Sequence, residues 1–405
     1  MSRARSFSKL INKDNYATYR GSDSVTDISA VSLPQGTLSF RNRIINGDMR
    51  IDQRNAGASV TFNDETFPVD RFRGNCTQSS KLNAQKSTNA PSGFTNSLLI
   101  TSSSSDSVAD GDVFQLSQFI EGFNVGDLGW GTLNAKTITV SFWVRSSLTG
   151  TFGGALKNST GGDRSYPFVY TISLADNWEY KTVTIPGDTS GTWLTDNSLG
   201  IRLSFSLGAG LTYSGTAGAW AGANYWSATG ATSIVGTSGA TFYITGVQLE
   251  EGTVPTPFEH RPYGLELSLC KRYCQVIQMI GLFIWPYSSD RAWLGLPLME
   301  PLRDYSSIQI SKTRRVARVT TYGVLDYWIS GGNVYNTGDW LNDIYFGGYE
   351  PGYNNEVTHM GAYILKSGSG NFSDQEPVTI SGVVNTSNNG FDSDGGFIII
   401  TSELT

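Results

Sequence analysis

The sequence has little charge and no long apolar run. Charged residues make up 16% of its 405 positions, against about 25% in typical soluble domains. No stretch of 18 apolar residues occurs, and the N-terminus lacks the apolar core of a signal peptide. We therefore expect no membrane insertion. Gly, Ser, Thr and Asn take the place of charged residues, and this mixture favours short strands joined by many turns over long helices.

Histidine and cysteine are also scarce. His260 and His359 stand in no metal-ligand or nucleophile pattern, and the three cysteines, Cys76, Cys270 and Cys274, are too few for a disulfide framework. The common hydrolase and nucleotide-binding motifs are missing. We therefore expect no enzyme activity, no cofactor and no metal. A polysaccharide depolymerase is a weaker alternative, because it needs only two carboxylates about 5 to 10 Å apart.

The charges that are present are unevenly distributed. A formal net charge of -6 argues against a nucleic-acid partner, because phosphate binding needs a clustered basic face. Residues 1–40 differ from the rest: they contain few large apolar side chains and cannot bury enough surface to fold alone. This segment is either a frayed terminus or an arm that docks on an acidic surface. Its basic residues are Arg3, Arg5, Lys9, Lys13 and Arg20.

From residue 41 onward, short alternating runs predict β-strands. Every second residue from Ile138 to Val144 is apolar, which is the period of a half-buried strand. Similar runs recur with turn-rich segments between them and without helical periodicity, so residues 41–262 are predicted to form one antiparallel jelly-roll β-sandwich. A Gly-rich stretch from Leu207 to Gly239 interrupts this pattern, and loops of this length are often functional.

A second domain is predicted from residue 263 to residue 405. The prolines between Thr253 and Pro262 suit neither a strand nor a helix and mark the boundary. Residues 265–279 fit either a short helix or a long strand, and their periodicity does not decide between the two. Further short apolar runs predict a second, smaller β-sandwich that forms a tip. The predicted fold class is therefore all-β, with an extended N-terminal arm.

Seven stretches of the sequence, taken in order, resemble one known family. They are 42–55 (NRIINGDMRIDQRN), 69–72 (VDRF), 140–146 (VSFWVRS), 178–189 (WEYKTVTIPGDT), 242–250 (FYITGVQLE), 256–262 (TPFEHRP) and 266–273 (ELSLCKRY). Together they resemble the carbohydrate-binding-like jelly-roll modules of bacteriophage tail-fibre proteins and related prophage proteins, a type abundant among marine and cyanobacterial phages. The family usually has Trp where this chain has Phe72. The order of the stretches makes the resemblance specific, although each one alone is weak.

The resemblance implies a tail-fibre or receptor-binding protein of the virion. Such a protein is expected to be a homotrimer that is made in the host cytoplasm, is carried on the phage particle and contacts other phage tail proteins. Its attachment would use the N-terminal arm, through Arg3, Arg5, Lys9, Lys13 and Arg20. The alternative is a structural capsid, neck or accessory fibre or decoration protein that binds no receptor.

The candidate ligand-binding residues are aromatic. Aromatic rings stack on the apolar faces of sugars while polar turns bind hydroxyl groups, so the expected ligand is a host cell-surface glycan or lipopolysaccharide. Packing in a core or a subunit interface is the alternative for each ring. The candidates are Trp340, Tyr345, Tyr349 and Tyr353 in the tip, and Trp220, Tyr225 and Trp226 in the Gly-rich stretch.

Most other residues of the resembling stretches are expected to have structural roles. Trp143 and Trp178 are expected to complete the core, whereas Gln248 and Glu250 alternate with apolar residues and are expected on the surface. Jelly rolls of this family sometimes hold a structural calcium. No spaced calcium loop is present, but four carboxylates are candidate ligands: Asp48, Asp52, Asp70 and Glu250.

Overall fold

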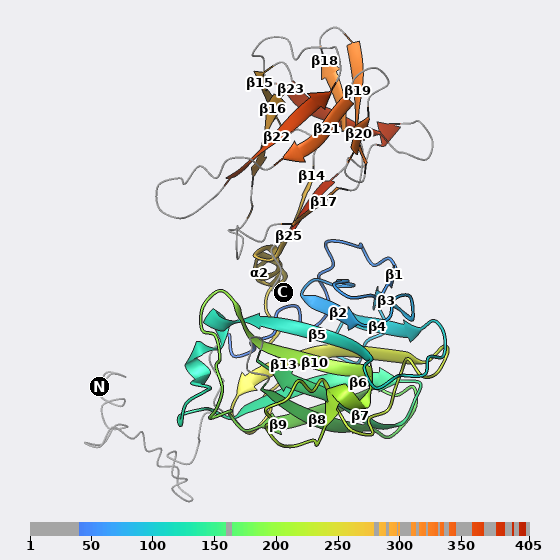
Figure 1. The fold of residues 1–405 in the computed structure, drawn as a ribbon, viewed down its shortest axis with the longest axis vertical. Coiled ribbons are helices and arrows are strands. Elements are labelled where there is room, and N and C mark those ends of the chain that lie inside the picture. Colours follow the sequence, from blue (N-terminus) through green and yellow to red (C-terminus); the bar gives the residue numbers. More distant parts are fainter. Residues whose placement is uncertain are drawn as a thin grey trace, which may run out of the picture.

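The structure, a computed structural model, describes residues 40–158 and 164–278, Met299, and the strands from β15 to β25. Side chains are described as far as Val276 and at Met299. Figure 1 shows a larger β-rich unit with β1 to β13 and a smaller one with β15 to β24, and α2 and β14 lie between them. Most described elements are strands, so the all-β prediction is confirmed. Among the described residues, no helix has the length and apolar character to cross a membrane.

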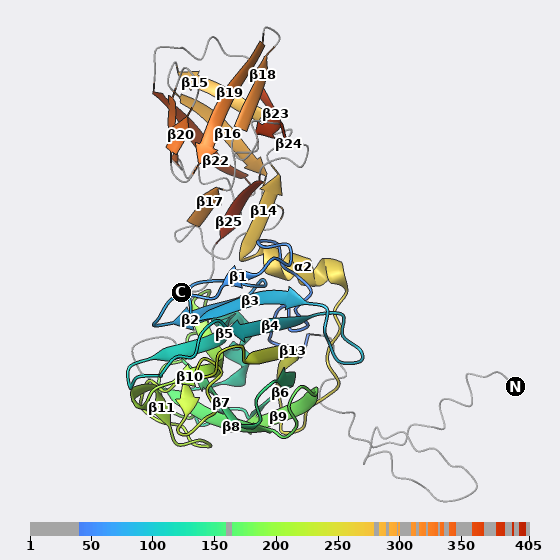
Figure 2. The same ribbon diagram turned by 90° about the vertical axis from the view of Figure 1, so that its right-hand side faces the viewer.

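The larger unit is a sandwich of two antiparallel sheets (Figure 2). The six-stranded sheet has the order β1-β3-β4-β13-β6-β9, and the five-stranded sheet has the order β2-β5-β10-β7-β8. Strands far apart in sequence are neighbours in both sheets, as in a jelly roll, and this prediction is confirmed as well. The strand bounds are β1 (Val60–Thr61), β2 (Phe72–Cys76), β3 (Leu82–Ser87), β4 (Ser97–Ser102), β5 (Val113–Glu121), β6 (Ile138–Ser146), β7 (Gly150–Lys157), β8 (Ser165–Ile172), β9 (Glu179–Ile185), β10 (Leu199–Ala209) and β13 (Thr241–Glu251).

Short elements connect these strands. Two 3₁₀ turns follow β5, and a third opens the segment between β10 and β13, where two short strands pair in parallel. They are η2 (Gly122–Asn124), η3 (Gly126–Leu128), η4 (Leu211–Tyr213), β11 (Ser214–Gly215) and β12 (Ser227–Ala228).

The core lies between the two sheets and follows the period of the strands. On β6, Ile138, Val140, Phe142 and Val144 are fully buried, as the alternation predicts. Phe142 reaches Phe205 of the opposite sheet, with ring centres 4.9 Å apart and ring planes at 72°. Burying one such side chain contributes roughly 1.5–3 kcal/mol, so rows of facing apolar residues hold the sheets together.

Two tryptophans lie outside this core. Trp143 is on the opposite face of β6 from Phe142, and its ring centre is 5.4 Å from that of Tyr180. Trp178 is half-buried, and its Nε1 donates a hydrogen bond to Asn89 Oδ1 at 3.2 Å. The expectation that both complete the core is therefore wrong. The two-residue period of a strand sends position 143 outward when positions 142 and 144 point inward.

The resembling stretches 42–55 and 242–250 meet in space and close the jelly roll. Asn42 bridges to β13, because its Oδ1 accepts a hydrogen bond from Leu249 N at 3.1 Å and its Nδ2 donates to Val247 O at 3.2 Å. Gly47 approaches the same strand so closely that a Cβ there would lie 2.1 Å from Val247 O. Only glycine allows this contact, and the role of these stretches is therefore structural.

Gln248 and Glu250 point away from the core, yet both are buried. The hydroxyl of Thr256 donates to Glu250 Oε2 at 2.6 Å, and the backbone N–H of Glu259 donates to Gln248 Oε1 at 2.9 Å. The segment that contains these two partners covers this part of the six-stranded sheet. The expectation of a surface role is therefore wrong, because the alternation of a strand does not show what a later segment covers.

A short helix leads out of the jelly roll. α2 (Tyr263–Lys271) is followed by β14 (Cys274–Gln278), so both elements that the sequence allowed in this region occur. Glu121, at the end of β5, accepts hydrogen bonds from Arg272 Nη2 at 2.6 Å, Arg272 Nε at 2.9 Å and the Tyr273 hydroxyl at 2.7 Å. We call Glu121, Arg272 and Tyr273 the joint. Because Glu121 is buried, these charge-assisted bonds fix the end of α2 to the five-stranded sheet.

Beyond α2, the described backbone forms two further antiparallel sheets. A three-stranded sheet has the order β14-β25-β17, and a nine-stranded sheet has the order β20-β19-β18-β23-β15-β16-β22-β21, with β24 beside β23. Since β25 pairs with β14, the chain returns to the point where it left the jelly roll. The bounds are β15 (Phe283–Ser288), β16 (Arg291–Pro297), β17 (Gln309–Lys312), β18 (Val316–Thr320), β19 (Gly323–Ser330), β20 (Asn333–Tyr335), β21 (Trp340–Tyr345), β22 (His359–Ser367), β23 (Val378–Val384), β24 (Phe391–Asp392) and β25 (Phe397–Thr401).

Candidate binding groove

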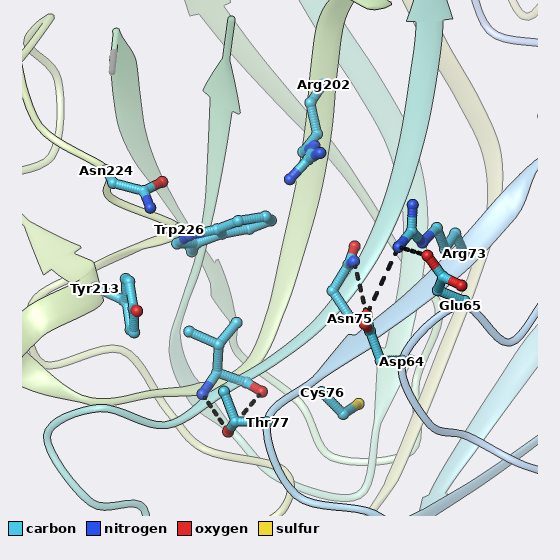
Figure 3. A pocket seen from close by; sticks show the side chains of 11 residues that line it. Asp64, Glu65, Arg73, Asn75, Cys76, Thr77, Arg202, Tyr213, Asn224 and Trp226 are labelled. Atoms are coloured by element: carbon cyan, nitrogen blue, oxygen red, sulfur yellow. Dashed lines mark hydrogen bonds and ion pairs between the residues drawn. The ribbon is translucent and has the colours of Figure 1, made fainter. Parts of the chain in front are cut away.

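A groove lies over the outer face of the five-stranded sheet (Figure 3). Its volume is about 530 Å³, within the range of small-molecule sites. Residues that line it come from β2 and β10 (Arg73, Asn75, Arg202), from the loop before β2 (Asp64, Glu65), and from the segment between β10 and β13 (Tyr213, Asn224, Trp226). Segments far apart in the sequence therefore meet at this groove.

Polar side chains lie in register on three adjacent strands of this sheet face, and one of them, Asn75, lines the groove. Asn75 of β2 is in register with Gln115 of β5, which is in register with Ser206 of β10. We call these three residues the amide row. A second row, two residues along each strand, consists of Arg73, Ser117 and Ser204. Alternation places both rows on the face opposite the core. The members of both rows on β5 and β10 are nevertheless buried, so this outer face is covered rather than solvated.

Several polar atoms of the amide row have no hydrogen-bond partner within the described part of the chain. Both amide atoms of Gln115, Oδ1 of Asn75 and Oγ of Ser206 are buried and unpartnered. Asn75 uses only its Nδ2, which donates to Asp64 Oδ1 at 3.1 Å. A buried polar atom without a partner costs about 1–3 kcal/mol. Water or a bound hydroxyl group can complete such atoms, and the amide row reaches the groove at its lining residue Asn75.

Arg73 holds the carboxylates at the rim of the groove. Its Nη2 lies 2.9 Å from Glu65 Oε1 and 3.8 Å from Asp64 Oδ1. Both carboxylate side chains are 57% exposed, whereas the side chain of Arg73 is 10% exposed. Figure 3 shows the three side chains on one side of the groove, joined by dashed lines. The charge of Arg73 is thus balanced by its own neighbours.

Arg202 is held by aromatic rings instead of carboxylates. Its guanidinium carbon is 4.0 Å from the ring centre of Phe119 and 4.8 Å from that of Trp226. Burial, followed by the repulsion from Arg73, lowers the pKa of Arg202 to about 10. It stays positive at neutral pH, and in Figure 3 its guanidinium points toward Trp226.

One wall of the groove is formed by residues 211–228. Trp226 N donates to Tyr213 O at 2.7 Å, which sets the two residues side by side. The hydroxyl of Ser165 on β8 donates to the backbone of this segment at 2.6 Å and anchors it to the sheet. The ammonium group of Lys157 contacts Asn224 and lies 3.9 Å from the ring centre of Trp226. The wall therefore combines aromatic surface with positive charge.

The three aromatic residues predicted in the Gly-rich stretch have different positions. Trp226 lines the groove. Tyr225 packs over the glycine of β11, where an added Cβ would lie 2.3 Å from the ring. Trp220 joins a cluster elsewhere, with its ring centre 5.5 Å from both Trp130 and Trp193. The structure therefore brings one of the three to the groove.

The other predicted binding residues are not part of this groove or are not described. Trp340 and Tyr345 begin and end β21, and their side chains lie outside the described residues. In Figure 1, β21 belongs to the smaller unit. Tyr349 and Tyr353 lie outside the described residues, as do Arg3, Arg5, Lys9, Lys13 and Arg20 of the arm.

The four carboxylates considered for calcium have other partners. Asp48 contacts the guanidinium group of Arg50, and Asp52 accepts hydrogen bonds from the backbone N–H groups of Asn55 and Gly57. Asp70 accepts a hydrogen bond from the backbone N–H of Gln53, and Glu250 accepts one from the hydroxyl of Thr256. Among the described residues, no group of three or more His, Cys, Asp or Glu could hold a metal ion.

The sequence analysis missed the cations and amides of the groove. Polar residues alternate with apolar ones at Gln115 and Ser117 on β5 and at Arg202 and Ser206 on β10. That pattern is the available signal, but it is the same for a solvated sheet face. Only the sheet order, which places β5 between β2 and β10, brings these residues together.

No protein-family model and no curated protein sequence matches this chain. Among solved structures, it is similar to a family 4 carbohydrate-binding module (15% identity, 51% of this chain and 98% of that chain, TM-score 0.26). It is also similar to a family 61 module in complex with β-1,4-galactotriose, with 15% identity and a TM-score of 0.27. This match covers 52% of this chain and 99% of that chain. A third similar structure is the family 11 carbohydrate-binding module of a Clostridium thermocellum cellulosomal cellulase, with 14% identity and a TM-score of 0.26. This match covers 50% of this chain and 99% of that chain. Likenesses with values this low carry no conclusion about what the chain binds.

Proposed function

We propose that this chain is a glycan-binding protein and that the groove on the five-stranded sheet is its binding site. The observation that carries the proposal is the buried amide row, whose polar atoms lack partners. Sugar hydroxyl groups both donate and accept hydrogen bonds, so they complement a row of amides and a hydroxyl. Tyr213 and Trp226 beside the row supply the apolar ring surface that the C–H faces of a sugar require.

The test compares binding and stability in two variants. Gln115→Leu removes an unpartnered amide at nearly constant volume, so it should keep or raise the melting temperature while lowering glycan affinity about tenfold, or about 1.4 kcal/mol. Trp226→Ala should weaken binding as well. Binding of the full chain to a panel of bacterial surface oligosaccharides is measured by calorimetry. The control is Tyr180→Ala, which changes an exposed ring on the other sheet. Unaltered affinity in Gln115→Leu would contradict the proposal.

We propose binding without cleavage of the glycan. The two carboxylates of the lining, Asp64 and Glu65, both contact Arg73, whereas a glycosidase requires one carboxylic acid that gives its proton to the leaving group. Incubation of the chain with the bound polysaccharide should therefore release no fragments. New reducing ends that disappear in Glu65→Gln would show a depolymerase instead.

We also propose that the chain acts in a bacteriophage tail fibre that adheres to host glycan. The support is the set of resembling stretches between residues 42 and 273. In this proposal the protein is a homotrimer attached to the virion through residues 1–40. Deleting residues 1–35 should leave a folded oligomer that still binds glycan but no longer joins phage particles. In this proposal the groove holds the glycan, so binding to host cells should persist if Trp340 and Tyr349, the candidates in the tip, are replaced by Ala.

A further inference from the structure

The carboxylates and cations of the groove are unevenly distributed between its two ends. Asp64 and Glu65 are both neighbours of Arg73 and lie at the exposed rim. Arg202 has no hydrogen bond and no ion pair with any described residue, and its Nε is among the buried atoms without a partner. Asp64 attracts Arg202 only through space, so this cation of the groove has no carboxylate in direct contact within the part of the chain that is described.

A second cation lies at the same end. Lys157 is in register with Arg202 on the neighbouring strand β7. The Lys157 ammonium and the Arg202 guanidinium both lie near Trp226, at 3.9 and 4.8 Å from the ring centre. Two cationic side chains therefore lie close to the ring of Trp226.

The amide row lies at the opposite end of the same strand face. Arg202 and Ser206 are both on β10 and point outward, four positions apart. Four residues of strand correspond to about 13 Å. A ligand that reaches both ends must therefore present neutral hydroxyl groups at the amide row and negative charge at Arg202.

We propose that the groove selects acidic glycans, with Arg202 binding an anionic substituent of the sugar, a carboxylate or a phosphate. This inference rests on the proposed glycan-binding function and names its ligand class. A guanidinium group offers parallel N–H donors that match two oxygens of either substituent. Contacts with Phe119 and Trp226 hold the Arg202 guanidinium in place before the ligand arrives, so little side-chain ordering is needed on binding. The guanidinium of Arg202 then gains a contacting partner that the described residues do not supply.

The experiment uses the full chain and three classes of oligosaccharide of equal length: neutral, uronic-acid-containing and phosphorylated. We expect at least one acidic class to bind tenfold or more tightly than the neutral class, and this preference should shrink as salt is raised. Arg202→Gln should remove the preference while changing affinity for the neutral oligosaccharide less than twofold. Arg202→Lys keeps the charge but loses the paired donors, so it should retain part of the preference.

The matched control is Arg145→Gln, which removes a guanidinium from the outer face of the six-stranded sheet, where it contacts Asp176 at 3.2 Å. It should leave all affinities unchanged. Melting temperatures show whether each variant is folded, and competition of the wild-type chain with free uronic acid gives a readout that needs no variant. Equal binding of neutral and acidic classes, or a preference that survives in Arg202→Gln, would overturn the acidic-ligand inference while leaving glycan binding intact. Failure of all three classes to bind would overturn the proposed function itself.

Discussion

The joint between the jelly roll and α2 allows a quantitative prediction. Glu121→Gln keeps the size of the side chain but removes the charge that accepts three hydrogen bonds from Arg272 and Tyr273. A hydrogen bond to a charged group contributes about 1.5–3 kcal/mol. The Gln oxygen can retain one bond, while its NH₂ group faces donors and loses the others. Arg272 is 35% exposed and regains hydration, so the expected destabilisation is reduced to about 2–4 kcal/mol.

Urea unfolding of the full chain, followed by the fluorescence of the tryptophan cluster around Trp220, measures this loss. The control is Glu251→Gln, because Glu251 forms a surface pair with Lys136 at 2.9 Å, and surface pairs contribute about 0–1 kcal/mol. A double-mutant cycle of Glu121→Gln with Tyr273→Phe should show coupling, since the two side chains share a bond. A loss no larger than that of the control, or zero coupling, would refute the view that these bonds hold the joint.

Three further predictions concern closure, acid stability and thiol reactivity. Gly47→Ala should strongly lower the urea midpoint or prevent folding, because its Cβ would meet backbone at 2.1 Å, whereas Gly264→Ala in α2, where nothing lies within 4 Å, should leave the midpoint unchanged or raise it. Burial tends to raise the pKa of Asp112, but hydrogen bonds from a backbone N–H and two side chains lower it overall from 3.8. The stability this adds is present above pH 3.8 and is lost as pH falls through the lowered pKa, so Asp112→Asn should flatten the acid limb of a stability–pH curve. Burial raises the pKa of the Cys76 thiol to about 12, so at pH 8 iodoacetamide should label Cys76 only after unfolding; rapid labelling of the native chain would contradict this.

The fold was largely predictable, because the period of a strand is a local property of the sequence. The alternation from Ile138 to Val144 predicted which side chains of β6 face the core. The same period places Trp143 on the outer face of the sheet. For this residue the strand period is a stronger argument than the general preference of tryptophan for protein cores. Gln248 shows the limit of the period, since it points outward and is buried by a segment that follows it in the chain.

The groove was less predictable, because its residues are brought together by sheet order rather than by spacing. Trp226 could be found from its place in a Gly-rich loop. Arg73, Gln115 and Arg202 lie on three strands that become neighbours only when the jelly roll forms. The burial of Gln115 depends on what covers the outer face, and no local pattern in β5 carries that information.

One strand links the groove to the joint. The outward positions of β5 include Gln115 in the amide row, Phe119 next to Arg202, and Glu121 in the joint. Tyr273 packs in one cluster with Phe119, so the ring that positions Arg202 also contacts the region where α2 leads to β14. The direction in which the chain leaves the jelly roll is therefore set by the same strand face that holds the proposed ligand. The bonds of Glu121 to Arg272 and Tyr273 therefore set the orientation of the proposed groove relative to the start of β14.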